Sequence, residues 1–331
     1  MRTLAVALAL VVAVVSTGCQ AGERTLTIYS GRTRSLVHPV LEQFSKDTGI
    51  AIRVRYGDTA EIAATILEEG ANSPADVFFA QDAGALGALT DAGLLQVLPD
   101  EVLGKVPEPF RSPDGRWVGV SGRSRVIAYN TDRVTPADLP ASVLEMTDPK
   151  WRGRVGWAPT NASFQAFVTA LRVDRGEAAA RDWLVAMKEN ARVYPNNITI
   201  VQAVAAGEVD VGLVNHYYLY PFLEEQGEGF KARNHFLGGG DIGALVNVAG
   251  AGILETSKNV ADARRFVEYL LGPAAQRFFA EETYEYPVID GVSTAAELPP
   301  ISSLQPPDVD LNGLADLEGT LALLRETGVL P

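Results

Sequence analysis

The pattern of the first eighty residues limits the fold more than any other feature of the chain. Three short segments, 25–29, 50–56 and 76–80, have the composition of strands. The first strand is followed by a segment that ends at Gly49, and the second by residues 60–69. In both segments apolar residues recur at helical spacing. Because strand-helix-strand-helix-strand order forms a parallel α/β unit, we expect an α/β fold.

The pattern starts again further along the chain. Strands are expected at 116–120, 126–129, 155–157, 209–214 and 244–251, and helices at 83–92, 162–173, 181–190, 198–206, 260–271, 274–282 and 314–326. The 331 residues are 47% hydrophobic, and this length and composition are enough for two globular domains with their own cores.

Residues 1–18 have the pattern of a secretory signal. Arg2 precedes an apolar run at 4–15, which is too short to span a bilayer. Cys19, the only cysteine, follows small residues and resembles the lipobox cysteine of bacterial lipoproteins, although Ser16 stands where an aliphatic residue is usual. We expect an exported lipoprotein, periplasmic or on the cell surface, anchored at Cys19; the alternative is a soluble exported protein with an incidental cysteine.

The chain is strongly acidic. Its net charge is −13, and removal of Arg2 with the leader changes it to −14. Such a surface argues against nucleic acid as a partner. No second apolar run is long enough for a membrane helix, so we expect the protein to contact the membrane only through the lipid anchor. We also expect a monomer.

The segment Asn215-His216-Tyr217-Tyr218 follows an expected buried strand. Ligands of open α/β sheets sit at the ends of strands. Two adjacent phenols can supply hard oxygen donors to a strongly Lewis-acidic metal ion. They can equally be half-buried packing residues, as tyrosines often are, so residue types alone leave both interpretations open.

Other segments offer donors for an anion. Ser-Gly-Arg occurs twice after an expected strand, ending at Arg32 and at Arg123, and suggests two turns with backbone and guanidinium contacts to an anion. The helix entries at Asn161-Ala162 and Asn196-Asn197 present free backbone N–H groups. Plain turns and ordinary helix caps explain the same residues, and this alternative stays open.

The sequence lacks the signatures of common enzymes. None of the three histidines lies in a serine-hydrolase context, no zinc spacing occurs, and no dinucleotide-binding motif follows the first strand. These absences favour capture of a ligand over catalysis, and we expect the protein not to be an enzyme. A secreted enzyme with an unrecognised site is the remaining alternative.

Several segments together resemble the periplasmic ferric-ion-binding proteins of bacterial ABC iron importers, which have the type II periplasmic-binding fold. The resemblance covers nearly the whole chain after the leader. The matching segments are 28–32, 68–70, 73–78, 121–126, 149–151, 203–204, 207–208, 215–218 and 243–246.

The resemblance implies two α/β lobes joined by hinge strands near 123–127 and 246–249. The N-terminal lobe would contain residues 24–123 and 247–297, and the C-terminal lobe 124–246 and 298–331. The ligand would bind between the lobes, which close over it.

The resemblance also assigns the metal to Tyr217 and Tyr218. Related branches add a histidine, a glutamate or a third tyrosine, where this chain has Thr33, Gln81 and Phe164. Thr33, Gln81 and His216 are therefore only possible additional cleft residues, and a bound anion, water or chelate would complete the coordination.

Family members hold a phosphate or carbonate beside the iron. The matching anion-binding residues are Arg32, Arg123, Asn161, Ala162 through its backbone, Asn197 and Asn215. The resemblance thus implies a protein that captures Fe³⁺, free or as a small complex, and hands it to an ABC permease. The alternative is a receptor for an organic anion such as a phosphonate or a phosphorylated small molecule.

Overall fold

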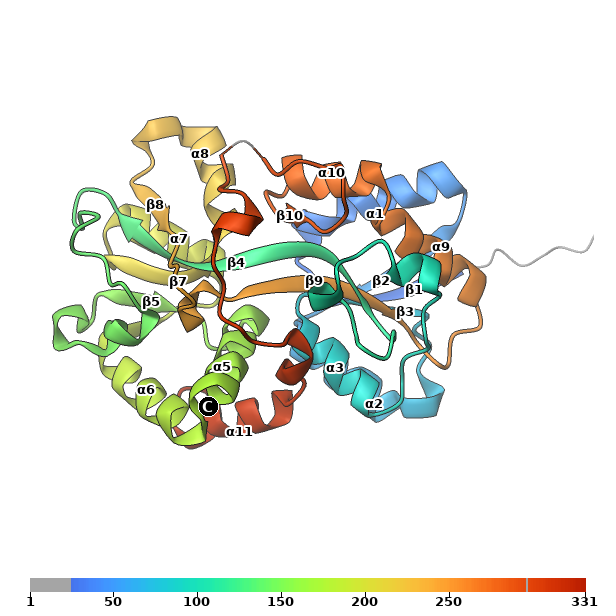
Figure 1. Ribbon diagram of the computed structural model, residues 1–331, viewed down its shortest axis with the longest axis horizontal. Coiled ribbons are helices and arrows are strands. Elements are labelled where there is room, and N and C mark those ends of the chain that lie inside the picture. Colours follow the sequence, from blue (N-terminus) through green and yellow to red (C-terminus); the bar gives the residue numbers. More distant parts are fainter. Residues whose placement is uncertain (1–24, 296) are drawn as a thin grey trace, which may run out of the picture.

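In the computed structural model, which describes residues 25–295 and 297–331, the chain forms two α/β lobes side by side (Figure 1). The expected signal segment 1–18 and Cys19 lie outside the described residues. Within the part of the chain that the structure describes, no helix has the length and apolar character needed to cross a membrane.

The first lobe is built on the expected parallel unit. β1 (Thr25–Ser30) lies between β2 (Ala51–Tyr56) and β3 (Val77–Ala80) and pairs parallel with both strands. The connecting helices are α1 (Arg34–Thr48) and α2 (Thr59–Glu69). The apolar residues that predicted α1 are its buried face, so the periodicity of this region identified its elements correctly.

Two long strands connect the lobes. β9 (Val246–Ile253) pairs antiparallel with β3 and with the first half of β4 (Val118–Asn130). From Arg125 onward, β4 pairs instead with β7 (Val211–Asn215) and β8 (Ala232–His235). β4 therefore belongs to both sheets, as expected of a hinge strand, and runs between the lobes beside β9 (Figure 1).

The second lobe repeats the parallel arrangement. β5 (Val155–Trp157) pairs parallel with both β7 and β6 (Ala191–Val193). Its helices are α5 (Ala162–Arg175), α6 (Glu177–Asn190), α7 (Asn197–Ala206) and α8 (Tyr220–Gln226). The remaining elements of the first lobe are α3 (Ala83–Asp91), α4 (Asp100–Leu103), α9 (Val260–Leu270), α10 (Pro273–Glu281) and β10 (Tyr286–Pro287), which pairs with β4.

The second Ser-Gly-Arg segment does not form the expected turn. Residues 121–123 lie inside the continuous strand β4, between β9 and β10. A Cβ at Gly122 would lie 3.2 Å from the Cβ of Tyr286, so the glycine allows β10 to approach closely. The turn prediction was wrong at Arg123, whereas Arg32 does follow the end of β1.

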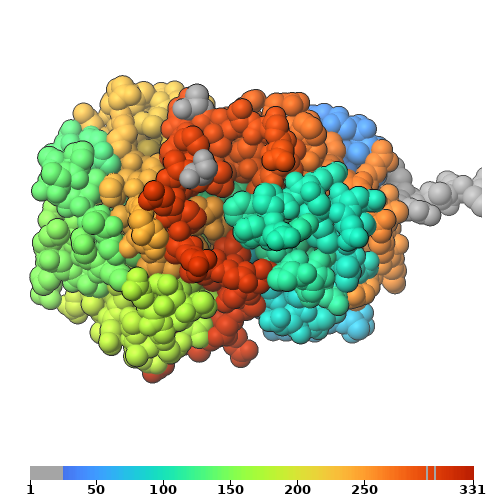
Figure 2. Space-filling model, in the orientation of Figure 1, coloured from blue at the N-terminus to red at the C-terminus, as the bar shows by residue number. Residues whose placement is uncertain are grey.

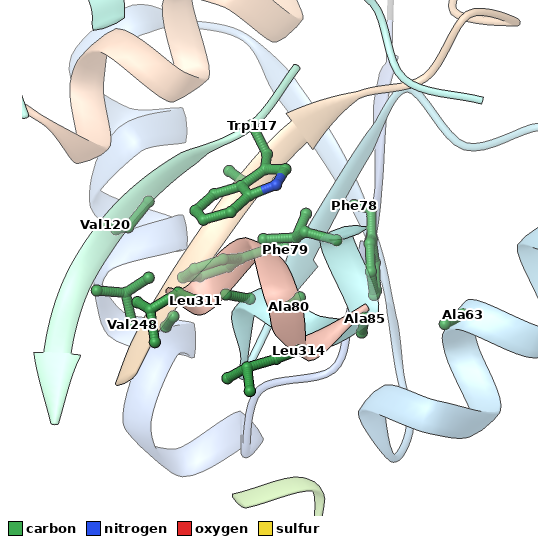
Figure 3. Close-up of a cluster of buried hydrophobic side chains, with 14 of the residues drawn as sticks. Ala63, Phe78, Phe79, Ala80, Ala85, Trp117, Val120, Val248, Leu311 and Leu314 are labelled. Carbon is green, nitrogen blue, oxygen red and sulfur yellow. The ribbon is translucent and has the colours of Figure 1, made fainter. Parts of the chain in front are cut away.

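The C-terminal residues contact both lobes. The 3₁₀ helix η9 (Leu311–Leu314) places Leu311 and Leu314 beside Phe79 and Val248 in the core of the first lobe (Figure 3). α11 (Leu317–Glu326) packs on α5 of the second lobe, where Thr169 and Thr320 share a hydrogen bond of 2.7 Å. The tail, in red in Figure 2, thus lies across the face between the lobes, and the expected lobe boundaries stay a prediction.

Candidate functional site

The paired tyrosines lie where β7 ends. β7 is buried along its whole length and stops at Asn215, and the next residues form the short 3₁₀ helix η5 (His216–Leu219). Tyr217 and Tyr218 are both buried, with their ring centroids 4.3 Å apart. The chain therefore turns directly after a buried strand and brings two phenols together at its end.

The phenol oxygen of Tyr217 is buried and has no hydrogen-bond partner among the described residues. Such an atom is uncommon in folded proteins and costs about 1–3 kcal/mol. Burial raises the pKa of Tyr218 well above its ordinary value; the phenol of Tyr217 adds to this shift, and the charge of Arg32 opposes it. The unpaired oxygen of Tyr217 favours a ligand at this atom, whereas the raised pKa keeps the phenol of Tyr218 neutral until a cation displaces its proton.

Three buried arginines, Arg32, Arg123 and Arg125, interact electrostatically with Tyr217. Nε and Nη1 of Arg32 and both Nη atoms of Arg123 lack hydrogen-bond partners within the described part of the chain. Burial lowers the pKa of Arg123, and burial together with the charge of Arg123 lowers the pKa of Arg125 to about 9. Buried guanidinium nitrogens that lack acceptors indicate a place for an anion.

Two buried carboxylates that the sequence analysis missed accompany the arginines. Glu285 accepts from Arg32 Nη2 at 2.6 Å and from Ser121 Oγ at 3.0 Å. Burial alone would lower the pKa of Arg32, but Glu285 and the phenols raise it. Burial raises the pKa of Asp82, and Arg123 opposes this shift. Glu285 lies 253 positions from Arg32, so no local pattern could reveal the pair.

A cleft of about 380 Å³ lies between the lobes beside these groups. Its lining includes Arg32, Thr33, Asp58 and Gln81 from the first lobe and Asn161, Asn196 and Tyr218 from the second. Asp58 was not predicted as a site residue, whereas Asn196 belongs to one of the helix entries expected to offer anion donors; the two residues directly precede α2 and α7. A larger cavity of about 1080 Å³, between residues 100–115 and the tail, contains none of the predicted site residues.

Three of the expected anion donors lie at helix N-termini. Asn161 caps α5 by accepting from the backbone N–H of Ser163 at 3.0 Å, and Ala162 is the first residue of that helix. Asn197 is the first residue of α7, and its Nδ2 is buried without a partner in the described structure. Backbone N–H groups in a first helical turn have no intrahelical acceptor, so both helices present donors.

Asn215 and His216 make hydrogen bonds that leave them little capacity for a ligand. The amide of Asn215 accepts from Arg125 at 3.2 Å and donates to Ser163 at 2.9 Å. His216 is fully buried; its Nδ1 accepts from a backbone N–H of β4 and its Nε2 lies 2.6 Å from the carbonyl oxygen of Tyr284. Burial lowers the pKa of His216 to about 4. Both residues therefore fix the turn that carries the tyrosines.

Few other side chains could serve as metal ligands. No group of three or more His, Cys, Asp or Glu residues within 25–295 and 297–331 could hold a metal ion. Phe164, where a related branch has a third tyrosine, is buried with its ring centroid 5.4 Å from that of Trp157. Of the paired tyrosines only Tyr218 lines the cleft, and Asp58 is the acidic residue among its lining side chains.

The sequence profile of the bacterial extracellular solute-binding proteins matches residues 72–310. The chain belongs to this family. This solute-binding protein is 37% identical over 309 residues to the major ferric iron-binding protein of Neisseria meningitidis serogroup B, covering 92% of this chain and 93% of the relative. The family and the type II periplasmic-binding fold expected from the sequence are confirmed.

Two solved structures have similar folds. Iron-bound HitA from Pseudomonas aeruginosa has a TM-score of 0.88 and 37% identity, and the match covers 92% of this solute-binding protein and 99% of HitA. A Trichodesmium protein, IdiA or FutA, in complex with iron and citrate has a TM-score of 0.77 and 32% identity, with coverage of 92% and 99%.

Proposed function

We propose that this solute-binding protein captures ferric iron between its lobes and delivers it to the permease of an ABC importer. The observation that carries the proposal is the buried phenol pair, in which the Tyr217 oxygen has no described partner, beside the unpaired nitrogens of Arg32 and Arg123. A small, highly charged cation accompanied by an anion satisfies both kinds of group at once. The ferric-binding names of the relatives support the same cargo.

Tyr217 and Tyr218 would bind the iron as phenolates. Each must lose its proton, so the affinity for iron should rise with pH. The anion, phosphate or carbonate, would be held by Arg32, Arg123 and the donors at Asn161, Ala162 and Asn197. A carboxylate chelate could take the same place, since the Trichodesmium relative holds iron with citrate.

The proposed organisation follows the two lobes. The N-terminal lobe comprises 24–123 and 247–297, and the C-terminal lobe 124–246 and 298–331, with the tail also packing on the first lobe. We propose a monomeric lipoprotein tethered through Cys19, with no catalytic function. Cys19→Ser should move the protein from the membrane fraction to the soluble fraction without loss of iron binding; retention on the membrane after signal removal would contradict the anchor.

Absorption spectroscopy tests the cargo. The purified protein, titrated with ferric salt and phosphate or carbonate, should develop a visible charge-transfer band, because phenolate donates into ferric iron. A receptor for an organic anion or a secreted enzyme should show no such band. Absence of colour, together with tight binding of a phosphonate, would favour the organic-anion receptor.

A further inference from the structure

One buried hydrogen bond crosses the cleft between Gln81 and Ser163. Gln81 follows β3 in the first lobe, and Ser163 lies in the first turn of α5 in the second. Nε2 of Gln81 is 2.7 Å from Oγ of Ser163, and the two residues are 5% and 2% exposed. This contact therefore exists only while the lobes are closed.

The direction of the bond follows from its neighbours. The Oδ1 atom of Asn161 accepts from the backbone N–H of Ser163, which can only donate. The same Oδ1 lies 2.7 Å from Ser163 Oγ, so the hydroxyl donates to it. Asn215 Oδ1 accepts from Arg125, which places Nδ2 of Asn215 toward Ser163 Oγ at 2.9 Å. Gln81 must therefore present its N–H, since the hydroxyl proton is already used.

Closure of the lobes thus gives the hydroxyl of Ser163 its full set of hydrogen bonds. Ser163 Oγ has one proton and two lone pairs. Asn161 takes the proton, Asn215 fills one lone pair from within the second lobe, and Gln81 fills the other from the first lobe. Opening the cleft removes only the bond to Gln81.

We propose that Gln81 is a closure latch, whose amide nitrogen holds the second lobe over the bound ion by donating to Ser163. This inference rests on the proposed function, because the latch acts on iron held in the cleft. It assigns to Gln81 a positioning role in retention, in place of direct coordination of the metal. Loss of the latch should speed iron release, since the closed state is less favoured relative to the open one.

Release of iron to excess chelator tests the latch. Gln81→Met keeps the length of the side chain and removes the donor, and Ser163→Ala removes its acceptor. Each should speed release roughly 3- to 10-fold, the range expected for one buried neutral hydrogen bond. Gln96→Ala is the control, because Gln96 makes a comparable bond to Leu254 within the first lobe and its loss should leave release unchanged.

The double variant separates a latch from a metal ligand. For a latch, Gln81→Met should add nothing once Ser163→Ala is present, because the same bond is already lost. If Gln81 acts independently of Ser163, the two effects should multiply, and the latch is wrong. Normal iron binding with unchanged release in Gln81→Met also overturns the latch alone, whereas a wild-type protein without the ferric band overturns the proposed function and the latch with it.

Discussion

Tyr217 has a polar atom whose burial is not compensated in the protein alone. Tyr217 is 1% exposed, its hydroxyl has no described hydrogen-bond partner, and its ring packs against the rings of His216 and Tyr218. A buried hydroxyl without a hydrogen bond lowers stability, whereas the same oxygen bound to a cation does not. The unpaired hydroxyl of Tyr217 therefore lowers the stability of the ligand-free protein and leaves an oxygen available to a bound cation.

We predict that Tyr217→Phe leaves the free energy of unfolding of the ligand-free protein unchanged or raises it. The change removes the unpaired oxygen and keeps the ring. Tyr286→Phe is the matched control, because the Tyr286 hydroxyl donates to the carbonyl of Pro299 at 3.0 Å; this change should lower stability by about 1 kcal/mol. Urea unfolding measures both variants. An equal loss in the two would show that Tyr217 is hydrogen-bonded like an ordinary tyrosine.

His216 should make stability depend on pH below neutrality. Its folded pKa of about 4 lies below the ordinary 6.5, so the neutral ring contributes stability above pH 6.5 that is lost as the pH falls toward 4. The full effect is about 3 kcal/mol. Urea unfolding of wild type and His216→Gln across this range isolates the effect, since carboxylates titrate in both. Parallel pH profiles for the two proteins would contradict it.

Among the elements, those with regular apolar periodicity could be predicted from the sequence, and the hinge strand could not. The longer helices and the core strands lie close to the expected ranges, because alternating or helical spacing decides which face is buried. The short elements β6, β8, β10, α4 and α8 were not expected. In β4, Ser121-Gly122-Arg123 has the composition of a turn, yet β9 and β10 pair on either side of it. Pairing with residues more than a hundred positions away overrides local propensity here.

Contacts between residues far apart in the sequence also limited the prediction of the site. Tyr217 and Tyr218 could be proposed as site residues from the sequence, because they follow an expected buried strand and match a family motif. Glu285 and Asp82 could not be assigned, since only the folded chain places their carboxylates beside Arg32 and Arg123.

The close approach of α7 to β7 gives a test at the scale of elements. A Cβ at Gly212 in β7 would lie 2.2 Å from Cγ2 of Ile200, so Gly212→Ala must shift the Ile200 side chain or the helix α7 that carries it. We expect a loss of about 1–3 kcal/mol in the free energy of unfolding. Gly229→Ala is the control, because that position has open space and should change stability by less than about 0.5 kcal/mol. Equal effects would refute the close packing.

For the whole molecule, the two crossing strands and the cleft between the lobes predict a closing motion. Ligand that binds the closed state preferentially shifts the population toward it. Small-angle scattering should therefore give a smaller radius of gyration after addition of ferric iron and anion. An unchanged profile at demonstrated saturation would contradict closure on binding.

Competition with a chelator tests most directly that iron is bound through the two phenolates. Ferric affinity should be measured for wild type, Tyr217→Phe and Tyr218→Phe, with phosphate or carbonate present and pH fixed. Loss of a direct ligand should weaken binding by more than about 100-fold, because even residues that only support a metal ligand contribute 10- to 100-fold. Affinities of both variants within about twofold of wild type, no larger than the effect of one weak lost hydrogen bond, would contradict the phenolate site.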